Sequence, residues 1–344
     1  MEKEIWIDII NPSHPLFFRP LIQELKKTNI VNITLRNRGE TVKLSEQFGL
    51  QGKIYGKDFE HPIKKMLSII NRTFSMSYTI KHFDYAISFE NPMSVAISKI
   101  RGAKSILLLD NDLKYKIKVN FFQNLESKIK LLANFIIIPS ACEITFVNYN
   151  KNDKFKSYNG YKEDFYIADY QPDETILNNL PIKEYILIRG EALNSFYVNK
   201  KQSIIQQLFD LFTKENINIL FLARDKSDLN YLKKENISIL REPLNGLDLI
   251  YYSNAVLTGS GTMAREAACM GKTAVSFFPS NVLLSVDQQL VDQGKMFHSR
   301  NPSEIVEYVL SNYGKKKTID FNRSKKVKKE VIKIINTFIE ENIV

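Results

Sequence analysis

Short apolar runs alternate with longer amphipathic segments along most of this chain. Runs such as EIWIDII at residues 4–10 and AVLTG at residues 255–259 are rich in aliphatic residues and end at a polar residue or a glycine. Continuous runs of this kind are typical of strands buried on both faces of a parallel sheet. The segments between them place apolar residues at helical spacing, so strand and helix are expected to alternate. Because eight regular units are missing, the pattern predicts a doubly wound α/β fold rather than a barrel.

The alternation is interrupted once, over residues 151–184. This segment is polar, rich in turn-forming residues and without periodicity, as in a connection between domains. A chain of 344 residues is also too long for one ordinary hydrophobic core. We therefore predict an N-terminal Rossmann-like domain at residues 1–167, a linker at residues 168–182, and a C-terminal Rossmann-like domain at residues 183–344. The two domains are expected to face a central cleft, and an amphipathic C-terminal helix is expected to close the second.

Residues 243–279 carry the clearest functional pattern. An apolar run ends at Gly259, and a segment of helical composition, MAREAACM, begins four residues later. The turn between them consists of Ser260, Gly261 and Thr262. A strand, a small-residue turn and a helix bring free backbone N–H groups and the positive end of the helix dipole together. This arrangement predicts an anion site, with a diphosphate as the first candidate.

Glu266 lies in the first turns of the same predicted helix. A carboxylate there complements the helix dipole, so one interpretation is an ordinary surface charge. The other interpretation is functional, because a carboxylate one turn into a phosphate-binding helix can accept hydrogen bonds from both hydroxyl groups of a ribose. We favour the functional interpretation.

The charge of the chain indicates anionic partners. Its formal net charge is +10, while 44% hydrophobic and 25% charged residues are typical of a soluble globular protein. Nucleotide sugars, phospholipid head groups and nucleic acid all fit this charge. The basic residues are spread among several helices rather than gathered in one stripe, so we do not expect a nucleic-acid partner.

The cysteines and the N-terminal residues bear on the compartment. Cys142 and Cys269 cannot form a disulfide framework and have no metal-ligand spacing. No basic-then-apolar leader precedes the first strand, and no apolar run is long enough to span a bilayer. These features predict a cytoplasmic protein.

Two stretches of the chain resemble known proteins. The segment SGTMAREA, residues 260–267, resembles the nucleotide-binding segment of GT-B-fold enzymes. The likeness is closest to the non-hydrolysing UDP-N-acetylglucosamine 2-epimerases and looser to the glucosaminyltransferase that makes lipid II. The segment IDIINPSHPLFFRPLIQEL, residues 7–25, resembles a family of GT-B-like proteins described as a domain of unknown function. The second likeness covers nearly the whole chain.

The likeness to GT-B enzymes implies a donor site in the second domain. It implies that Ser260, Gly261 and Thr262 face the diphosphate of a UDP-sugar and that Glu266 holds its ribose. Arg189 follows the first strand of that domain, where the likeness implies a basic residue facing the donor phosphates. A salt bridge between Arg189 and the nearby Glu191 is the competing interpretation.

Three further candidates follow strands of the first domain. His14 follows the first strand, and Glu90 and Asp110 end two later apolar runs, so all three are expected at the carboxyl edge of the sheet, where ligands bind in open α/β sheets. His14 is the candidate general base, although a lone histidine is more often structural. The likeness to the 2-epimerases implies that Glu90 and Asp110 belong to the catalytic cleft. The competing interpretation makes them helix caps or loop carboxylates.

These features predict a GT-B-type glycosyltransferase that uses a nucleotide-diphosphate sugar and needs no metal or other cofactor. A nucleotide-sugar 2-epimerase is the alternative, although Thr262 and Arg265 depart from the epimerase pattern. A non-catalytic nucleotide-sugar-binding protein is the third hypothesis. The sequence does not indicate the sugar, the acceptor or the oligomeric state.

A peripheral membrane role is a separate hypothesis, and it would allow a lipid-linked acceptor. Residues 62–83 interleave basic side chains, including Lys64, Lys65 and Arg72, with apolar ones. Residues 114–130 repeat the mixture. Basic helices with interleaved apolar residues are typical of proteins that bind anionic bilayers. The competing interpretation is that the apolar residues face the sheet and the lysines are solvated.

Overall fold

The computed structural model describes residues 2–57, 59, 62–149, 153–191, 202–223, 236–240, 244–315 and 318–340, with side chains left out for 62–66. The chain forms two compact units. The first unit contains Met1–Tyr166 together with Lys326–Val344, and the second contains Ile167–Lys325. Within the described residues, no helix is both long and apolar enough to span a membrane.

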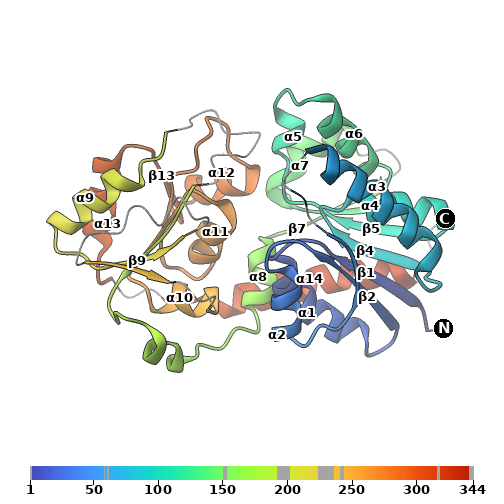
Figure 1. The fold of residues 1–344 in the computed structure, drawn as a ribbon, viewed down its shortest axis with the longest axis horizontal. Coiled ribbons are helices and arrows are strands. Elements are labelled where there is room, and N and C mark those ends of the chain that lie inside the picture. Colours follow the sequence, from blue (N-terminus) through green and yellow to red (C-terminus); the bar gives the residue numbers. More distant parts are fainter. Residues whose placement is uncertain are drawn as a thin grey trace. The chain divides into compact units, whose positions relative to one another are not determined.

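The first unit is built on a parallel sheet in the order β3-β2-β1-β4-β5-β6-β7 (Figure 1). Its strands are β1 (Glu4–Ile9), β2 (Ile30–Asn37), β3 (Lys53–Lys57), β4 (Tyr85–Phe89), β5 (Lys104–Leu108), β6 (Phe135–Pro139) and β7 (Phe155–Tyr158). The described helices are α1 (His14–Leu25), α2 (Thr41–Gln47), α3 (Pro62–Thr79), α4 (Pro92–Arg101), α5 (Leu113–Lys116), α6 (Phe121–Lys130), α7 (Glu143–Phe146), α8 (Lys162–Ile167) and α14 (Phe321–Glu340).

The contacts of side chains in β1 and β4 show which helices cover each face of this sheet. Trp6 and Ala86 belong to a cluster that contains Met76 of α3 and Ile97 of α4, so α3 and α4 cover that face. Successive residues of a strand point to opposite faces. Tyr85, the neighbour of Ala86, donates a hydrogen bond to the carbonyl of Ile339 in α14. The helix α14 therefore covers the other face.

The C-terminal helix α14 packs on the first unit. The sequence instead predicts that this helix closes the C-terminal domain at residues 183–344. Phe338 stacks on Phe135 of the first unit with ring centroids 4.2 Å apart. Gly160 leaves space for Val327, which would overlap any Cβ at that position. The apolar stripe of this helix predicts that it packs against one of the domains, but such a stripe does not encode which of the two sheets it covers.

The second unit holds a parallel sheet in the order β10-β9-β8-β11-β12-β13. Its strands are β8 (Ile186–Arg189), β9 (Ile219–Leu222), β10 (Ile237–Leu240), β11 (Ala255–Thr258), β12 (Thr273–Ser276) and β13 (Phe297–His298). The described helices are α9 (Ile205–Lys214), α10 (Gly246–Tyr252), α11 (Gly261–Cys269), α12 (Ser285–Asp292) and α13 (Pro302–Asn312). Both sheets are doubly wound, which confirms the predicted fold class.

The predicted linker at residues 168–182 is part of the second unit. Tyr170 donates to the Asp248 carboxylate at 2.6 Å, and the backbone N–H of Asp173 donates to the same oxygen at 3.1 Å. Residues Glu174–Asn179 form a 3-10 helix. These hydrogen bonds hold a segment of polar composition on the unit, and the composition alone does not reveal such pairing.

Candidate functional site

In each sheet, successive strands of the chain are added first on one side of the first strand and then, after one crossover, on its other side. In the first unit this reversal point lies between β1 and β4, and in the second it lies between β8 and β11. Loops at the carboxyl ends of such neighbouring strands leave a crevice, where open α/β sheets bind ligands. The predicted site residues follow these strands, and we take the two units one at a time.

In the second unit, the turn after β11 passes close to the backbone after β8. The N–H of Gly259 donates to the carbonyl of Arg189 at 3.3 Å. A Cβ at position 259 would lie 2.8 Å from the Cα of Glu191, which is closer than two carbon atoms can approach. Glycine is therefore required at this position for steric reasons.

The turn residues Ser260, Gly261 and Thr262 form the half-exposed start of α11. Ser260 occupies the N-cap position, but its side chain makes no capping hydrogen bond. Its own N–H donates to the Thr258 hydroxyl at 2.9 Å. The first turn of a helix leaves N–H groups without intrahelical partners. The start of α11 thus has the donors and the dipole that an anion site needs.

Gly261 has a steric role as well. A Cβ there would lie 2.7 Å from a guanidinium nitrogen of Arg265. That guanidinium is buried and pairs with Asp287 at 2.9 Å. The ion pair explains both the glycine and the presence of Arg265 beside the predicted ribose ligand, because the arginine charge is neutralised within the unit.

Glu266 is 7% exposed and lies among the buried residues of α11. The interpretation of Glu266 as a solvated surface charge is therefore wrong. Burying a carboxylate is costly unless hydrogen-bond donors or cations surround it. Its burial one turn into α11 agrees with a binding role.

Arg189 ends β8 beside the turn after β11. The competing salt bridge with Glu191 is not formed, because Glu191 pairs with Arg300 at 2.6 Å and accepts from Ser203 at 2.5 Å. Among the described residues, the buried Nε of Arg189 has no hydrogen-bond partner. A partly buried guanidinium with an unmatched donor next to the start of α11 suits an anionic ligand.

In the first unit, His14 is buried at the start of α1. The N–H of Ile10 donates to its Nδ1 at 3.4 Å, and the Asn11 amide nitrogen lies 3.2 Å from its Nε2. Burial, together with the positive charges of Lys162 and Arg38, lowers the pKa of His14 to about 3, although Asp8 and Asp110 act in the opposite direction. The imidazole is therefore neutral at physiological pH.

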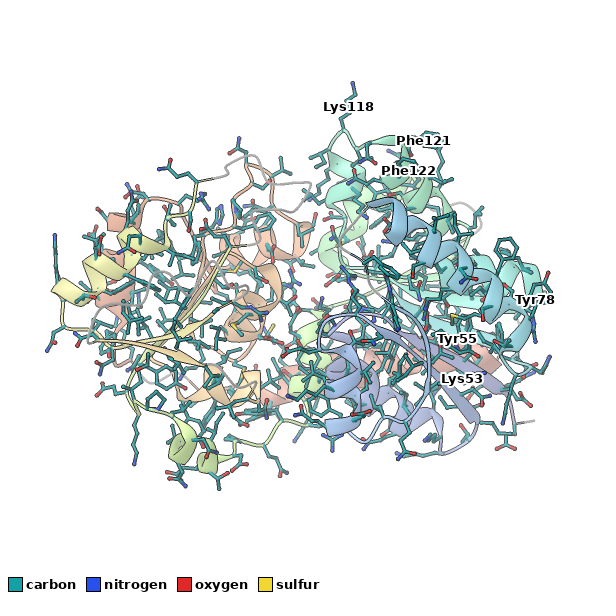
Figure 2. All side chains as sticks on the ribbon, in the orientation of Figure 1. Lys53, Tyr55, Tyr78, Lys118, Phe121 and Phe122 are labelled. Atoms are coloured by element: carbon teal, nitrogen blue, oxygen red, sulfur yellow. The ribbon has the colours of Figure 1, made fainter. Side chains whose placement is uncertain are left out.

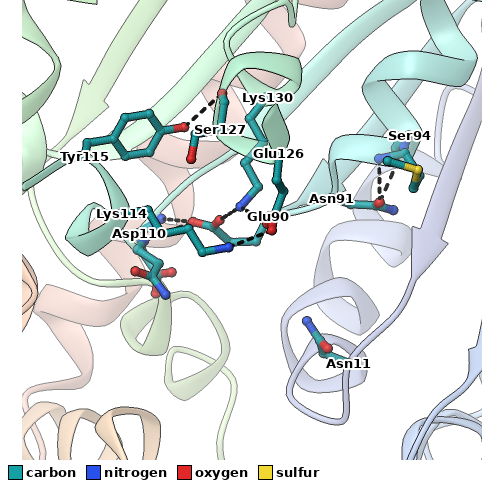
Figure 3. A network of polar contacts seen from close by, with 12 residues as sticks. Asn11, Glu90, Asn91, Ser94, Asp110, Lys114, Tyr115, Glu126, Ser127 and Lys130 are labelled. Carbon is teal, nitrogen blue, oxygen red and sulfur yellow. Dashed lines mark hydrogen bonds and ion pairs between the residues drawn. The ribbon is translucent and has the colours of Figure 1, made fainter. Parts of the chain in front are cut away.

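Glu90 follows β4 and holds the neighbouring loop in place (Figure 3). Its Oε1 accepts from the N–H groups of Asp110 and Asn111 at 3.1 and 3.0 Å. Its Oε2 accepts from Lys130 at 2.5 Å. Glu90 also has a positive φ of 52°, a conformation that is unfavourable for a residue with a Cβ. Three hydrogen bonds to its carboxylate stabilise that conformation, which agrees with the loop-carboxylate interpretation.

Asp110 follows β5 and pairs with a residue that the sequence did not suggest. Lys162, at the start of α8, lies 2.9 Å from the Asp110 carboxylate. The same ammonium lies 5.2 Å from the centroid of the Phe89 ring, and the ring of His14 is 6.0 Å from that of Phe89. Asp110, Lys162 and His14 thus form one polar cluster at the carboxyl edge, which we call the edge cluster.

The sequence also did not suggest the buried ion pair that lies below this edge. Asp8 of β1 accepts from Arg72 at 2.6 Å and from Thr34 at 2.7 Å through one oxygen. Its second oxygen accepts from Asn91 at 2.8 Å, and Asn91 caps α4. The assignment of Arg72 to a bilayer-facing side of its helix is therefore wrong. An aspartate inside an otherwise apolar strand was the available signal.

The structure thus brings the predicted residues together in two groups. His14, Glu90 and Asp110 lie at the carboxyl edge of the first sheet. The carboxyl edge of the second sheet carries Arg189 and the turn Ser260 to Thr262, and Glu266 lies on the helix that follows this turn. Among the residues that the structure describes, no cluster of three or more His, Cys, Asp or Glu side chains is placed to hold a metal ion.

Solved structures with the same architecture include a UDP-GlcNAc 2-epimerase and a glycotransferase. The UDP-GlcNAc 2-epimerase of Methanocaldococcus jannaschii, solved with UDP-GlcNAc and UDP, is similar with a TM-score of 0.76 and 14% identity, over 97% of this chain and 99% of that one. A structure described as the glycotransferase of kitacinnamycin has a TM-score of 0.59 and 11% identity, over 100% and 99% of the two chains. These likenesses confirm the GT-B-like fold.

A sequence relative spans the same length. The protein MJ0665 of Methanocaldococcus jannaschii, described as uncharacterized, is 26% identical over 332 residues, which cover 91% of this chain and 92% of that protein. The match to a protein family extends over residues 3–336, and thus includes both units. The chain belongs to the family described as "Protein of unknown function (DUF354)".

Proposed function

We propose that the protein is a GT-B-type glycosyltransferase whose donor is a nucleotide-diphosphate sugar, with a UDP-sugar as the first candidate. The observation that carries the proposal is the half-exposed start of α11, which has no side-chain cap and lies beside Arg189 at the reversal point of the second sheet. Structures with the same fold include one solved with UDP-GlcNAc and UDP, which supports this class of donor.

In this proposal the second unit stabilises the leaving group. The N–H groups at Gly261 and Thr262, the α11 dipole and the Arg189 guanidinium neutralise the diphosphate as its charge develops. Glu266 accepts hydrogen bonds from the ribose hydroxyls. No metal is part of the proposal, because these groups supply the positive potential that a cation otherwise provides.

The edge cluster of the first unit is assigned to the acceptor. The acceptor oxygen forms a bond to the anomeric carbon of the sugar, the bond from that carbon to the diphosphate oxygen breaks, and the proton of the acceptor passes to His14. His14 is neutral and can accept it, but a pKa of about 3 is low for an efficient base. That pKa already includes the stabilising charges of Asp8 and Asp110, so His14 is a weak base. His14→Ala should lower turnover about a hundredfold while donor affinity is kept.

A nucleotide-sugar 2-epimerase is the second candidate, because the epimerase structure is similar over nearly the whole chain. Its proton shuttle would be Glu90 and Asp110. Both oxygens of Glu90 are held by backbone N–H groups and Lys130, and a carboxylate engaged in this way is poorly placed to exchange protons. A binding protein without turnover is the third candidate.

A two-step experiment tests the proposal. Thermal unfolding with UDP, GDP, CDP and the corresponding sugars identifies the donor, since a ligand at a hundred times its Kd adds about 2.7 kcal/mol of stability. Incubation with the selected nucleotide sugar and NMR of the products then separates the three candidates. Transfer or release of the sugar supports the transferase, a C2 epimer supports the epimerase, and binding without products supports the third candidate. If no nucleotide changes the melting temperature, the donor site is refuted.

A further inference from the structure

The outer side of α3 exposes a line of large apolar side chains. Leu67, Ile70, Phe74 and Tyr78 are between 45% and 82% exposed. Their spacing of three and four residues places them along one side of the helix. The opposite side of α3 is already used, because Met76 is buried in the cluster around Trp6. The exposed line is therefore an additional apolar surface and not part of the core.

A second group lies on α6. Phe121, Phe122 and Leu125 are between 46% and 75% exposed, and the two phenylalanine rings pack edge to face with centroids 5.7 Å apart. Figure 2 shows Phe121 and Phe122 on the outside of the first unit, next to the extended side chain of Lys118. The helix α4 packs against both α3 and α6, so both groups belong to one layer. We call these seven residues the α3–α6 surface.

The charged residues around this surface are mostly basic. Residues 62–132 contain 12 Lys or Arg and 5 Asp or Glu. Four of the five acids pair with a lysine, namely Glu90 with Lys130, Asp110 with Lys162, Asp112 with Lys116, and Glu126 with Lys114 and Lys130. Asp84 lies 3.7 Å from the exposed His82. Among the side chains that the structure describes in this region, the exposed lysines are Lys81, Lys99, Lys116, Lys118 and Lys128.

The structure changes which basic residues matter here. Arg72 is buried against Asp8, and Lys114 is paired with Glu126, so neither adds to the surface charge as the sequence suggested. The side chains of Lys64 and Lys65 lie outside the described residues. Among the described side chains, the positive potential therefore rests on exposed lysines that flank the apolar groups, most of them within the two segments 62–83 and 114–130.

We propose that the α3–α6 surface binds a lipid bilayer that contains anionic phospholipid. Exposed aromatic and aliphatic side chains within a lysine-rich region match a layer of acyl chains beneath negative head groups. A protein partner is less well matched, because lysine is depleted from the buried part of protein interfaces. Apolar surface of this extent on a monomer marks a contact of some kind, and the charge selects the bilayer.

The surface is connected to the candidate site through the fold. A helix that follows a parallel strand begins at the carboxyl edge of the sheet, so Phe121 and Phe122, at the start of α6, lie toward the edge that carries Asp110. A bilayer bound there would present a lipid-linked acceptor to the first unit. That last step rests on the proposed function, whereas bilayer binding itself does not.

Vesicle sedimentation tests the proposal. The full-length protein is mixed with vesicles of phosphatidylcholine alone or with about a third phosphatidylglycerol, at low and high salt, because charge screening grows with salt. We expect binding to the anionic vesicles that weakens at high salt. The double variant Phe121→Ser/Phe122→Ser should reduce the partition coefficient at least tenfold. Both side chains are exposed, so folding should be kept, which circular dichroism checks.

The matched control is Leu310→Ser, an exposed apolar residue of α13 in the second unit, which should bind as the wild type does. A second variant, Phe74→Ser/Tyr78→Ser, tests the α3 part independently. The proposal is overturned if the wild type does not sediment with anionic vesicles. It is also overturned if both double variants bind these vesicles as tightly as the wild type does. It is also overturned if the wild type is a dimer that these substitutions dissociate, since a second copy would then cover the surface. Nucleotide binding that persists in these cases leaves the proposed function intact.

Discussion

Lys162 pairs with Asp110 at the carboxyl edge of the first sheet, and their charged atoms lie 2.9 Å apart. Asp110 follows β5, whereas Lys162 follows β7, two strands further along. Both side chains are almost fully buried, so each needs the other to offset the cost of leaving water. The same lysine charge contributes to the low pKa of His14. This pair therefore sets the electrostatics of the edge cluster.

Replacing Lys162 should affect turnover more than donor binding. Lys162→Met leaves the buried Asp110 carboxylate without its cation, which should disturb the geometry of the edge cluster. We therefore expect turnover to fall about ten- to a hundredfold although the pKa of His14 rises, while nucleotide affinity, which the proposal assigns to the second unit, is unchanged. Lys162→Arg should restore part of the activity. The control is Lys156→Met, an exposed lysine that pairs with Asp153 on the surface.

A specific readout distinguishes this role from a purely structural one. Because Lys162 is one cause of the lowered pKa of His14, Lys162→Met should move that pKa upward, and the imidazole resonances of His14 in NMR spectra report it. An unchanged titration of His14 in a folded Lys162→Met variant would contradict the coupling.

His14 should make the stability of the first unit depend on pH. Its pKa is about 3 in the folded unit and about 6.5 when unfolded, so between these values the unfolded chain binds the extra proton. Stability is then complete above pH 6.5 and decreases as the pH falls, by about 1.4 kcal/mol per pH unit. Trp6, the single tryptophan, is buried in this unit, and its fluorescence follows unfolding in urea.

The variant His14→Asn removes the titrating group. Between pH 6.5 and 5 it should lose about 2 kcal/mol less stability than the wild type does. His82→Asn, in which an exposed histidine of the same unit is replaced, should keep the wild-type slope. Equal slopes for His14→Asn and wild type would show that His14 is not neutral and buried in the folded unit.

The strand ends of the edge cluster could be predicted from the sequence, but its partners could not. Parallel strands place every carboxyl end at one edge, so the alternation of elements was sufficient to bring His14, Glu90 and Asp110 together. Lys162 reaches Asp110 only because of the strand order. That order depends on how whole elements pack, and no local pattern of residues encodes it.

The same limit applies to Glu90 and to the second unit. The sequence offered two roles for Glu90, and the contact that bears on them comes from Lys130, 40 residues away. Gly259 was identified as a strand end, but its need for glycine comes from the backbone of Glu191. The periodicity of the C-terminal helix was clear, whereas its docking on Phe135 and Tyr85 is a tertiary choice between two similar sheets.

Glu90 and Lys130 should act as a stabilising pair. Burial alone would lower the pKa of Lys130, but Glu90 and Glu126 raise it well above its ordinary value. Glu90→Gln retains an oxygen for the two backbone N–H groups and loses the charge that Lys130 needs, so we expect a loss of about 3 kcal/mol. Unfolding in urea followed by Trp6 fluorescence measures it.

A double-mutant cycle tests the pairing. Lys130→Met should cost a similar amount, and the double variant should cost clearly less than the sum of the two. Additive losses would mean that the two side chains act independently. If Glu90→Gln instead abolishes turnover at unchanged stability, Glu90 has the proton-transfer role that the epimerase alternative requires.

Glu266 should discriminate between ligands with and without a ribose. If its carboxylate accepts hydrogen bonds from the ribose hydroxyls, Glu266→Gln should weaken UDP binding by about 1 to 3 kcal/mol, the usual cost of losing a charged hydrogen-bond partner. Affinity for inorganic pyrophosphate, which in the proposal contacts the turn at residues 260–262 and Arg189 but not Glu266, should be unchanged. Titration calorimetry measures both ligands.

A further ligand isolates the contact with one hydroxyl group. Wild type should bind UDP more tightly than 2′-deoxy-UDP, and in Glu266→Gln this preference should shrink. The control is Glu307→Gln, an exposed glutamate of α13 in the same unit. Because Glu266 is buried, its substitution also alters the stability of α11, and a merely structural role would weaken UDP and pyrophosphate alike. Selective loss of the ribose-bearing ligand is therefore the result that assigns Glu266 to the donor, and equal loss of both would assign it to the helix.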